Sequence, residues 1–484
     1  MAALVSACSD DPSPKDEFNI NIVSPSNVAY VQGEVSIVAE ASLSAIAGAT
    51  VFVDNVLFQE IVGNTINVAW DSRTVADGTH VIKVVARDAN GQESSKELEV
   101  EVLNNFVTLN IPAGYMASGV TKLFFFSDQD GNVLTVAEAE NAAQLVFATP
   151  STLKPGDAVT LSIFTQGASS EDIESFSHFK PGVYHLKKPA GTIATGTHRI
   201  QITSAPEGNS TWTAASENIR AMKYLYESEA NILMDVPMGY STADIFLSHS
   251  TGPQEESATY RLLTQAEAGA TTIVDFSTFT PMDMLELNAD PTSTFSMSIV
   301  KGLEDPDNDM SILDVWERFA VNGFGDPTKF QIIYPGSLFP RYVFTNIFTT
   351  ETHAYKNQHV GASPPLSVTP IEADITAVQH EGATVLVTSS GTYDYIALSA
   401  FSNATGQRSF NWSIFVPPGE SRVIKIPNIP NEVKAKTNSA FENLEFKGGI
   451  ISDYESLDGY DAYLEFIFNM PDTQYLSFRE KNPA

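Results

Sequence analysis

The feature that most constrains the fold is a strict alternation of apolar and polar residues, which recurs along the whole chain. Clear examples are residues 97–102, 159–163, 199–203 and 295–299. Successive side chains of a β-strand point to opposite faces of a sheet, so each of these segments buries one face only. The sequence therefore predicts an all-β protein.

Turn residues between the alternating segments indicate how the strands are connected. Glycine tolerates the positive φ of tight turns, so Asp-Gly, Asn-Gly and Pro-Gly pairs are typical of strand connections. Such pairs stand at 77–78, 90–91, 130–131, 155–156 and 458–459. Short strands separated by turns at this spacing predict tandem β-sandwich domains.

The length of the chain, 484 residues, is several times the usual size of a domain. Three or four separately cored units are therefore expected. The expected divisions are a signal remnant and linker over 1–17, an Ig-like domain over 18–104, two sandwich repeats over 105–230 and 231–370, and a C-terminal sandwich over 371–484.

A weak internal repeat supports the two middle divisions. Residues 108–115 and 233–240 both end in Pro-x-Gly-Tyr, and each is followed by an apolar segment. Because repeated segments indicate duplicated folds, we expect 105–230 and 231–370 to share one fold. Chance similarity between β-rich sequences is the alternative.

The segment 18–104 is the most legible unit. Apolar strands near its start are followed by Trp70, by the Asp77-Gly78 turn and by a final alternating strand over 97–102. This order resembles the bacterial Ig-like domains attached to many secreted enzymes and adhesins. The resemblance implies that Trp70 fills the space between two sheets and that the domain acts as a spacer.

The charge balance excludes one class of partner. The sequence has 27 Lys and Arg against 59 Asp and Glu, which gives a formal net charge of −32. Such a chain repels phosphate backbones and anionic lipid. Nucleic acid is therefore not an expected partner.

Cys8 is the only cysteine, so the chain has no intramolecular disulfide. Small residues precede it and Ser9-Asp10-Asp11 follow it. This arrangement resembles a bacterial lipobox followed by the acidic export signal of Bacteroidota surface lipoproteins. The resemblance implies that a lipid on Cys8 anchors the protein to the outer face of the bacterial outer membrane. The alternative is a buried or incidental free thiol.

No run of the sequence approaches 18 consecutive apolar residues, so a transmembrane helix is not expected. Acyl chains on a cysteine hold a protein at a membrane without such a helix. The lipid anchor is therefore the membrane attachment that the sequence predicts.

A short acidic segment is the candidate metal site. Asp305, Asp307 and Asp309 alternate along it, and Asp314 follows. Carboxylates on a short loop can surround Ca²⁺, which takes six to eight oxygen ligands. The segment resembles the D-x-D-x-D loops of calcium-binding repeats in secreted bacterial proteins, although Met310 stands where those loops have glycine. Ca²⁺ is the one cofactor that the sequence suggests.

The same segment also has the pattern of a helix start. Ser311 and Asp314 fit a capping box, and carboxylates are favoured at the positive end of the helix dipole. These signals predict one short helix over 312–321. The helix and the calcium site are compatible with each other.

Aromatic residues among polar ones are candidates for ligand binding. They are Trp212, Tyr454, Tyr460 and Tyr463. Aromatic rings can stack on the apolar face of a sugar. Core packing is the alternative for each of them.

No catalytic motif is present. The sequence lacks G-x-S-x-G, H-E-x-x-H and a G-x-G-x-x-G that follows a strand. No catalytic residue is therefore assigned, and a non-enzyme is expected. A glycosidase needs only two placed carboxyl groups, so 59 acidic residues leave that class open.

The preferred interpretation is a non-catalytic cell-surface lipoprotein that binds extracellular glycan or protein. It is similar in layout to accessory glycan-binding lipoproteins of Bacteroidota, which is an analogy of layout and not of an identified site. One alternative is a surface polysaccharide hydrolase with an Ig-like accessory domain. The other is a structural subunit of an adhesive or secretion-linked surface assembly.

Overall fold

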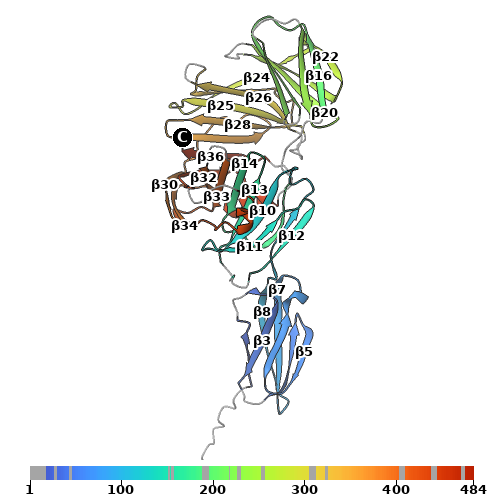
Figure 1. Ribbon diagram of the computed structural model, residues 1–484, viewed down its shortest axis with the longest axis vertical. Coiled ribbons are helices and arrows are strands. Elements are labelled where there is room, and N and C mark those ends of the chain that lie inside the picture. The colour runs from blue at the N-terminus through green and yellow to red at the C-terminus, as the bar shows by residue number, and fades with distance from the viewer. Residues whose placement is uncertain are drawn as a thin grey trace, which may run out of the picture. The chain divides into compact units, whose positions relative to one another are not determined.

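The computed structural model describes most of the chain. The described residues are 18–26, 30–42, 46–150, 153, 157–187, 196–216, 219–225, 231–251, 257–304, 312–321, 325–402, 409–437, 444–469 and 475–483. Nearly all regular structure in them is β-strand, so the expected all-β fold of tandem β-sandwiches is confirmed (Figure 1). The chain divides into two compact units. One ends at Thr108 and also holds Val146–Asp157 and Lys180–Val183; the other holds the remainder.

The strands fall into five consecutive groups within the described residues, which we call modules 1 to 5. Module 1 comprises β1 (Ile20–Ser24), β2 (Tyr30–Val31), β3 (Glu34–Ala41), β4 (Ile46–Val53), β5 (Val56–Val62), β6 (Ile66–Asp71), the short 3-10 helix η1 (Ser72–Thr74), β7 (Gly78–Asp88) and β8 (Glu93–Val102). Module 2 comprises β9 (Asn105–Ile111), β10 (Thr121–Ser127), β11 (Val133–Glu138), β12 (Ala143–Ala148), β13 (Thr160–Gln166), β14 (Ser170–Phe176) and β15 (Gly182–His185).

Module 3 comprises β16 (Gly196–Thr203), β17 (Ser210–Ser216), β18 (Ile219–Leu225), β19 (Asn231–Met238), β20 (Thr242–Thr251), β21 (Ala258–Glu267), β22 (Thr271–Asp275), η2 (Phe276–Thr278) and β23 (Thr280–Pro281). Module 4 comprises β24 (Asp283–Asn288), β25 (Phe295–Leu303), β26 (Ile312–Val321), β27 (Lys329–Tyr334), β28 (Arg341–Thr349) and β29 (His353–Gly361). Module 5 comprises β30 (Asp374–Glu381), β31 (Thr384–Ser390), β32 (Tyr395–Ser402), β33 (Ser409–Val416), β34 (Ser421–Lys425), α1 (Asn431–Lys434), β35 (Gly448–Tyr454), α2 (Gly459–Phe468) and β36 (Phe478–Pro483).

One pairing scheme recurs in all five modules. Six successive strands carry it: β3–β8, β9–β14, β16–β21, β24–β29 and β31–β36. In each set the first strand pairs with the fourth, the second pairs with the third and the fifth, and the fifth pairs with the sixth. Two small sheets that face each other in this order make an Ig-like sandwich. The chain is therefore a tandem repeat of one topology.

The repeat does not follow the expected boundaries. The segments 108–115 and 233–240, whose likeness suggested the repeat, lie on β9 and β19. These strands are the first of module 2 and the fourth of module 3, so they are not equivalent. The strand equivalent to β9 is β16, which begins at Gly196.

Edge strands join three of the modules into one sheet of twelve strands. Its order is β11-β10-β13-β14-β33-β32-β35-β36-β29-β28-β25-β26. Module 5 supplies the four middle strands. Its β33 pairs in parallel with β14 of module 2, and its β36 pairs antiparallel with β29 of module 4. A division at 230 and 370 therefore separates strands that share a sheet.

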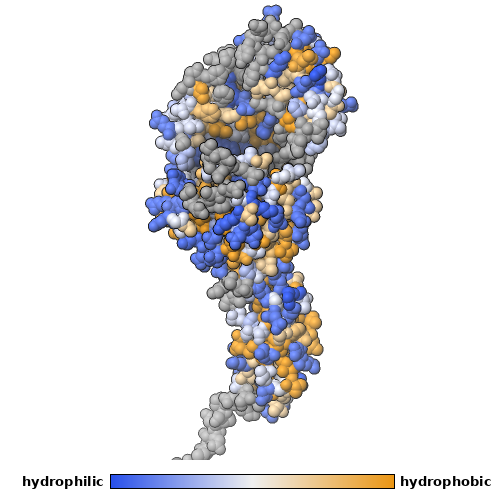
Figure 2. Space-filling view, in the orientation of Figure 1, coloured by the Kyte–Doolittle hydropathy of each residue, from blue (hydrophilic) through white to orange (hydrophobic). Residues whose placement is uncertain are grey.

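The cores follow from the alternation of apolar residues. In module 1, Trp70 is buried between the sheets beside Ile37, Val51 and Val84, as the resemblance to Ig-like domains implied. Modules 2 and 5 share one core, in which Phe164 and Ile173 meet residues of β31–β35. The visible face of the chain mixes hydrophobic and hydrophilic side chains, as expected where each strand buries only one face (Figure 2).

The helix expected over 312–321 is a strand, β26, which pairs with β25 along its whole length. The capping signals there describe only local preference, and the long antiparallel ladder overrides them. The longer of the two α-helices in the described residues is instead α2. Its Tyr460, Tyr463, Leu464 and Phe468 are buried and have helical spacing.

Candidate functional site

Most residues of the expected lipidation and calcium sites lie outside the part of the chain that the structure describes. Cys8, Asp305, Asp307 and Asp309 lie outside the described residues. Asp314 lies on β26 opposite Lys301 of β25, and its Oδ1 is 3.2 Å from Lys301 Nζ. Asp314 therefore forms a cross-strand ion pair. Within the described ranges, no group of three or more His, Cys, Asp or Glu side chains could hold a metal ion.

Trp212 does not have the ligand-binding role expected from the sequence. Its side chain is 0% exposed in the core of module 3, where its ring lies 4.3 Å from that of His249 and 5.6 Å from that of Phe276. Its indole N–H donates to Ser210 Oγ at 3.0 Å. A ring enclosed on every side cannot stack on a sugar, so Trp212 is a core residue. The alternation of β17 places it on the inner face of its sheet.

The three tyrosines come together, with Tyr460 and Tyr463 buried and Tyr454 half-buried. The ring centroids of Tyr454 and Tyr463 are 6.0 Å apart, and those of Tyr460 and Tyr463 are 6.1 Å apart. Tyr460 and Tyr463 are buried where α2 packs on the sheet, and Tyr463 stacks on Tyr395 at 4.1 Å. Burial raises the pKa of each of the three phenols. Tyr460 and Tyr463 therefore belong to an aromatic core cluster and offer no stacking face to a ligand, and the half-buried Tyr454 packs beside them.

The site with the richest chemistry lies where β14 and β33 end. These neighbours run in parallel, so their carboxyl ends meet at one edge of the sheet. A pocket of about 510 Å³ opens there. It is bordered by the loop after β10, by the start of β13, by the ends of β14 and β33, and by the whole of β34. Modules 2 and 5 both contribute to it.

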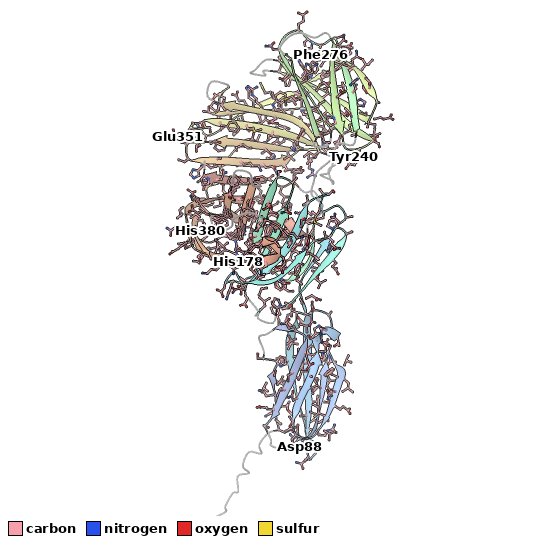
Figure 3. The ribbon with its side chains drawn as sticks, in the orientation of Figure 1. Asp88, His178, Tyr240, Phe276, Glu351 and His380 are labelled. Carbon is pink, nitrogen blue, oxygen red and sulfur yellow. The ribbon has the colours of Figure 1, made fainter. Side chains whose placement is uncertain are left out.

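His178 is held at this pocket by its neighbours (Figure 3). Ser177 N–H and Ser177 Oγ donate to Phe415 O at 3.0 and 3.1 Å, which fixes the end of β14 against β33. Phe179 is buried, and its N–H donates to Val159 O at 2.8 Å. Between these two anchors His178 has a φ of 57°, in the left-handed region. His178 is exposed, and a non-glycine residue in this costly conformation is typical of functional positions.

The surroundings of His178 favour the neutral form of its imidazole. Partial desolvation lowers its pKa, the Arg422 guanidinium lowers it further, and the Asp461 carboxylate opposes both. A neutral imidazole has one N–H donor and one acceptor nitrogen. His178 Nδ1 lies 3.3 Å from Ser177 Oγ, whose hydroxyl already donates to Phe415 O, so Nε2 is the ring nitrogen left for a polar ligand.

Charged side chains of both signs surround the same pocket. Asp128 and Asp130 belong to the loop after β10, and Arg422 and Lys425 belong to β34. Asp128 accepts hydrogen bonds from the backbone N–H groups of Asp130 and Asn132 at 2.9 and 2.8 Å, so it shapes its own loop. Arg422 Nε donates to Pro418 O at 2.8 Å. The arrangement provides several donors and acceptors around one polar opening.

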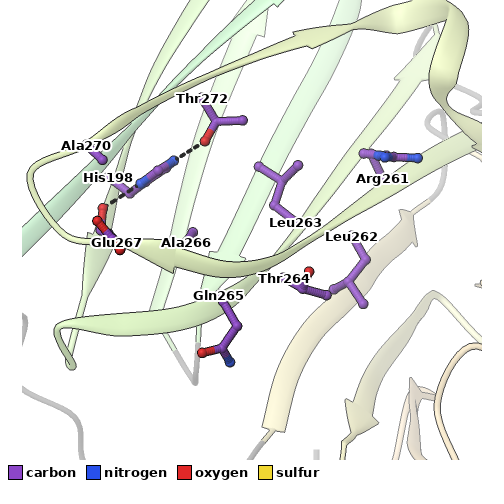
Figure 4. A pocket seen from close by; sticks show the side chains of 10 residues that line it. All are labelled: His198, Arg261, Leu262, Leu263, Thr264, Gln265, Ala266, Glu267, Ala270 and Thr272. Carbon is purple, nitrogen blue, oxygen red and sulfur yellow. Dashed lines mark hydrogen bonds between the residues drawn. The ribbon is translucent and has the colours of Figure 1, made fainter.

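A second pocket, of about 380 Å³, lies in module 3 between β21 and β22 (Figure 4). His198 lines it but is itself buried, with its two ring nitrogens 2.7 Å from Glu267 O and 3.0 Å from Thr272 Oγ1. Both nitrogens are thus satisfied within the protein. We interpret His198 as a structural residue that fastens the β21–β22 connection.

Sequence reasoning missed the His178 pocket. Histidines scattered among strands and loops carry no spacing signal, and nothing near residue 178 suggests a site. The pocket depends on a parallel pairing in which Ser170 is opposite Ser409, nearly half the chain away. Only the left-handed backbone at a non-glycine residue marks the position, and that is visible only in the structure.

Among the described residues, no helix is long and apolar enough to cross a membrane.

Comparison with known proteins identifies the first module. Residues 19–84 match the family model of the bacterial Ig domain. No curated protein matches the sequence. Similar solved structures include fibronectin(III)-like modules of Clostridium thermocellum CbhA, with 14% identity over 32% of this chain and 92% of that chain and a TM-score of 0.17.

Two others are the Bacillus anthracis TIE protein and Bacteroides ovatus SGBP-B. The first has 12% identity over 70% of each chain and a TM-score of 0.17. The second, from a mixed-linkage glucan utilization locus and solved with a mixed-linkage heptasaccharide, has 12% identity over 65% of this chain and 91% of that chain and a TM-score of 0.15. Likenesses this weak carry no inference about function. Residues 19–84 thus belong to a bacterial Ig domain, which is followed by further β-sandwiches in the described part of the chain.

Proposed function

We propose that this chain is a cell-surface lipoprotein that binds an extracellular glycan or protein without turning it over. The observation that carries the proposal is the His178 pocket, an opening of about 510 Å³ that presents carboxylate, imidazole, guanidinium and ammonium groups. Most ligand sites are concave and use a few convergent polar groups for orientation. In this proposal the lipid on Cys8 holds the protein at the outer membrane, and module 1 is a spacer.

The chemistry of the pocket favours binding over hydrolysis. A glycosidase needs two carboxyl groups on either side of the scissile bond, one of them holding a proton. Both oxygens of Asp128 accept hydrogen bonds inside its own loop, from Asp130 N, Asn132 N and Asn132 Nδ2. Only Asp130 is left among the carboxylates of the pocket lining. The pocket lining therefore lacks the second carboxyl group that hydrolysis of a glycosidic bond needs.

Replacing His178 with alanine is expected to weaken ligand binding about tenfold, because a central hydrogen-bonding group of a pocket contributes about 1.4 kcal/mol or more. Screening the chain on glycan and extracellular-protein arrays supplies the ligand, and calorimetry then gives the Kd of wild type and variant. His380→Ala, on β30 and outside the pocket lining, is the matched control. An unchanged Kd for His178→Ala would place the binding elsewhere. Release of reducing sugar from a bound glycan would favour the hydrolase.

The proposed anchor is tested separately. Mass spectrometry of the native, full-length gene product should find acyl chains on Cys8 and the protein in the outer-membrane fraction. An unmodified thiol in a cytosolic fraction would contradict both the anchor and the surface role.

Calcium binding by the acidic segment 305–309 remains a proposal from the sequence. A cation bound only by the native state raises the melting temperature. We therefore expect EDTA to lower the melting temperature of module 4 by a few degrees, and added Ca²⁺ to restore it. Calorimetry with and without EDTA provides the measurement, and Asp307→Asn combined with Asp309→Asn should abolish the effect. Identical melting curves would rule the calcium site out.

A further inference from the structure

The strand β34 has a free edge. Among the described strands it pairs with β31 alone. Two backbone hydrogen bonds fix which of its groups face β31: Ile426 N–H donates to Ala383 O, and Glu420 O accepts from Ser389 N–H. Bonded and non-bonded residue pairs alternate along an antiparallel ladder. The intervening pairs therefore leave the backbone N–H and C=O groups of Ser421, Val423 and Lys425 directed away from β31.

This free edge borders the His178 pocket. All five residues of β34 line the pocket, together with His178 and the end of β33. The Val423 side chain is 67% exposed, although its neighbour Ile424 is buried in the core. The pocket thus combines an unpaired row of backbone donors and acceptors with an exposed apolar side chain and with charged groups on both sides.

We infer that the ligand of the His178 pocket is an extended polypeptide segment of a partner protein, which adds to β34 as a further strand. The inference rests on the proposed function and specifies its ligand class. A row of free N–H and C=O groups is the chemistry that recognises another extended backbone. No Phe, Tyr or Trp is among the described residues that line the pocket, so the usual stacking face for a sugar is missing there.

The side chains along the free edge of β34 indicate which residues the partner segment should contain. A strand opposite β34 would be about five residues long, to match Ser421–Lys425. A residue opposite Val423 would be apolar, since cross-strand apolar pairs stabilise a sheet. A residue opposite Lys425 would be acidic, since Lys425 is exposed and its ammonium group, which donates to Thr384 Oγ1 at 3.0 Å, has further N–H donors. A short strand that ends in lysine also resists pairing with a second copy of itself, because the two strands would carry like charges.

The test uses the full chain and a displayed library of random nonapeptides as the probe. Peptides selected on the wild type are synthesised, and their Kd is measured for the wild type, Val423→Pro and Val423→Ala. Proline removes the outward N–H of residue 423, a group that the β31–β34 ladder does not use, so the fold should tolerate it. We expect Val423→Pro to weaken binding at least tenfold and Val423→Ala, which keeps the N–H, to weaken it less than about threefold.

A second readout does not depend on the proline variant folding. Bound peptide should slow amide hydrogen exchange at Ser421, Val423 and Lys425, because their N–H groups become hydrogen-bonded. Unchanged exchange at all three residues, or peptides that bind Val423→Pro as tightly as the wild type, would overturn the inference.

Failure of this inference is distinguishable from failure of the proposed function. If only glycans bind, with an affinity that falls in His178→Ala but not in Val423→Pro, the pocket remains the ligand site and strand addition is wrong. If neither peptides nor glycans bind in a way that depends on His178, both proposals are wrong.

Discussion

Replacing Trp212 with alanine should lower the free energy of unfolding of module 3 by about 3–5 kcal/mol, the usual cost of removing a large aromatic side chain from a core. The ring is fully buried and contacts the rings of His249, Phe276 and Phe279 at centroid distances of 4.3, 5.6 and 5.8 Å. These neighbours lie on β20 and in and beside η2. Trp212 also shares its core with residues of β16 and β19 in the other sheet, so the cavity would open between the two sheets of the module.

The measurement is urea unfolding of the full chain, with the module 3 transition identified by hydrogen exchange of amides in β17 and β20. Tyr240→Ala is the matched control, since Tyr240 is an aromatic residue of the same module that is 53% exposed. The control should change the stability by less than about 0.5 kcal/mol. Equal effects of the two substitutions would show that Trp212 is not a core residue.

The prediction that Trp212 and the tyrosines expose their rings to a ligand failed for one physical reason. Exposure of an aromatic residue depends on the face of the strand or helix that it occupies, and polar neighbours in sequence do not determine that face. The spacing of Tyr460, Tyr463, Leu464 and Phe468 is that of an amphipathic helix, which buries one stripe. Reading the period of the segment, and not its polar neighbours, would have placed these rings in the core.

The fold class was predictable because alternation alone determines it. Every module needs strands with one apolar face and turns between them. The alternation of apolar and polar residues and the turn pairs occur along the whole sequence. The number of modules was not predictable in the same way. A sandwich fixes the alternation of residues but few of their identities, so equivalent strands such as β9 and β16 share little sequence. The sequence similarity between β9 and β19 was misleading, because half-buried strands share the same alternation of apolar and polar residues.

The candidate site was beyond the sequence for a different reason. It arises where two edge strands from separate modules, β14 and β33, pair in parallel. Local propensity and turn chemistry describe neighbours along the chain, and neither identifies which edges will meet. The same limit applies to β26, whose ladder with β25 decides its structure against the capping signals at its start.

Acidification should destabilise module 3 through His249. This residue is 4% exposed, and within the described structure its Nε2 has no hydrogen-bond partner. Burial lowers its pKa from 6.5 to about 4, so the imidazole stays neutral in the folded protein well below neutral pH. The unfolded chain takes up a proton near pH 6.5. Stability is therefore full above that pH and falls as the pH drops toward 4.

The expected loss between pH 7 and pH 4 is about 3 kcal/mol, at 1.36 kcal/mol for each unit of pKa difference. Unfolding of module 3 by urea across this range provides the measurement. Carboxylates elsewhere also titrate there, so the decisive quantity is the difference between wild type and His249→Phe. Phenylalanine keeps the ring contact with Trp212 but takes up no proton. Between pH 7 and pH 4, the stability of the His249→Phe variant should therefore fall by about 3 kcal/mol less than that of the wild type. If the two proteins lose stability in parallel, His249 is not the acid-sensitive group of this core.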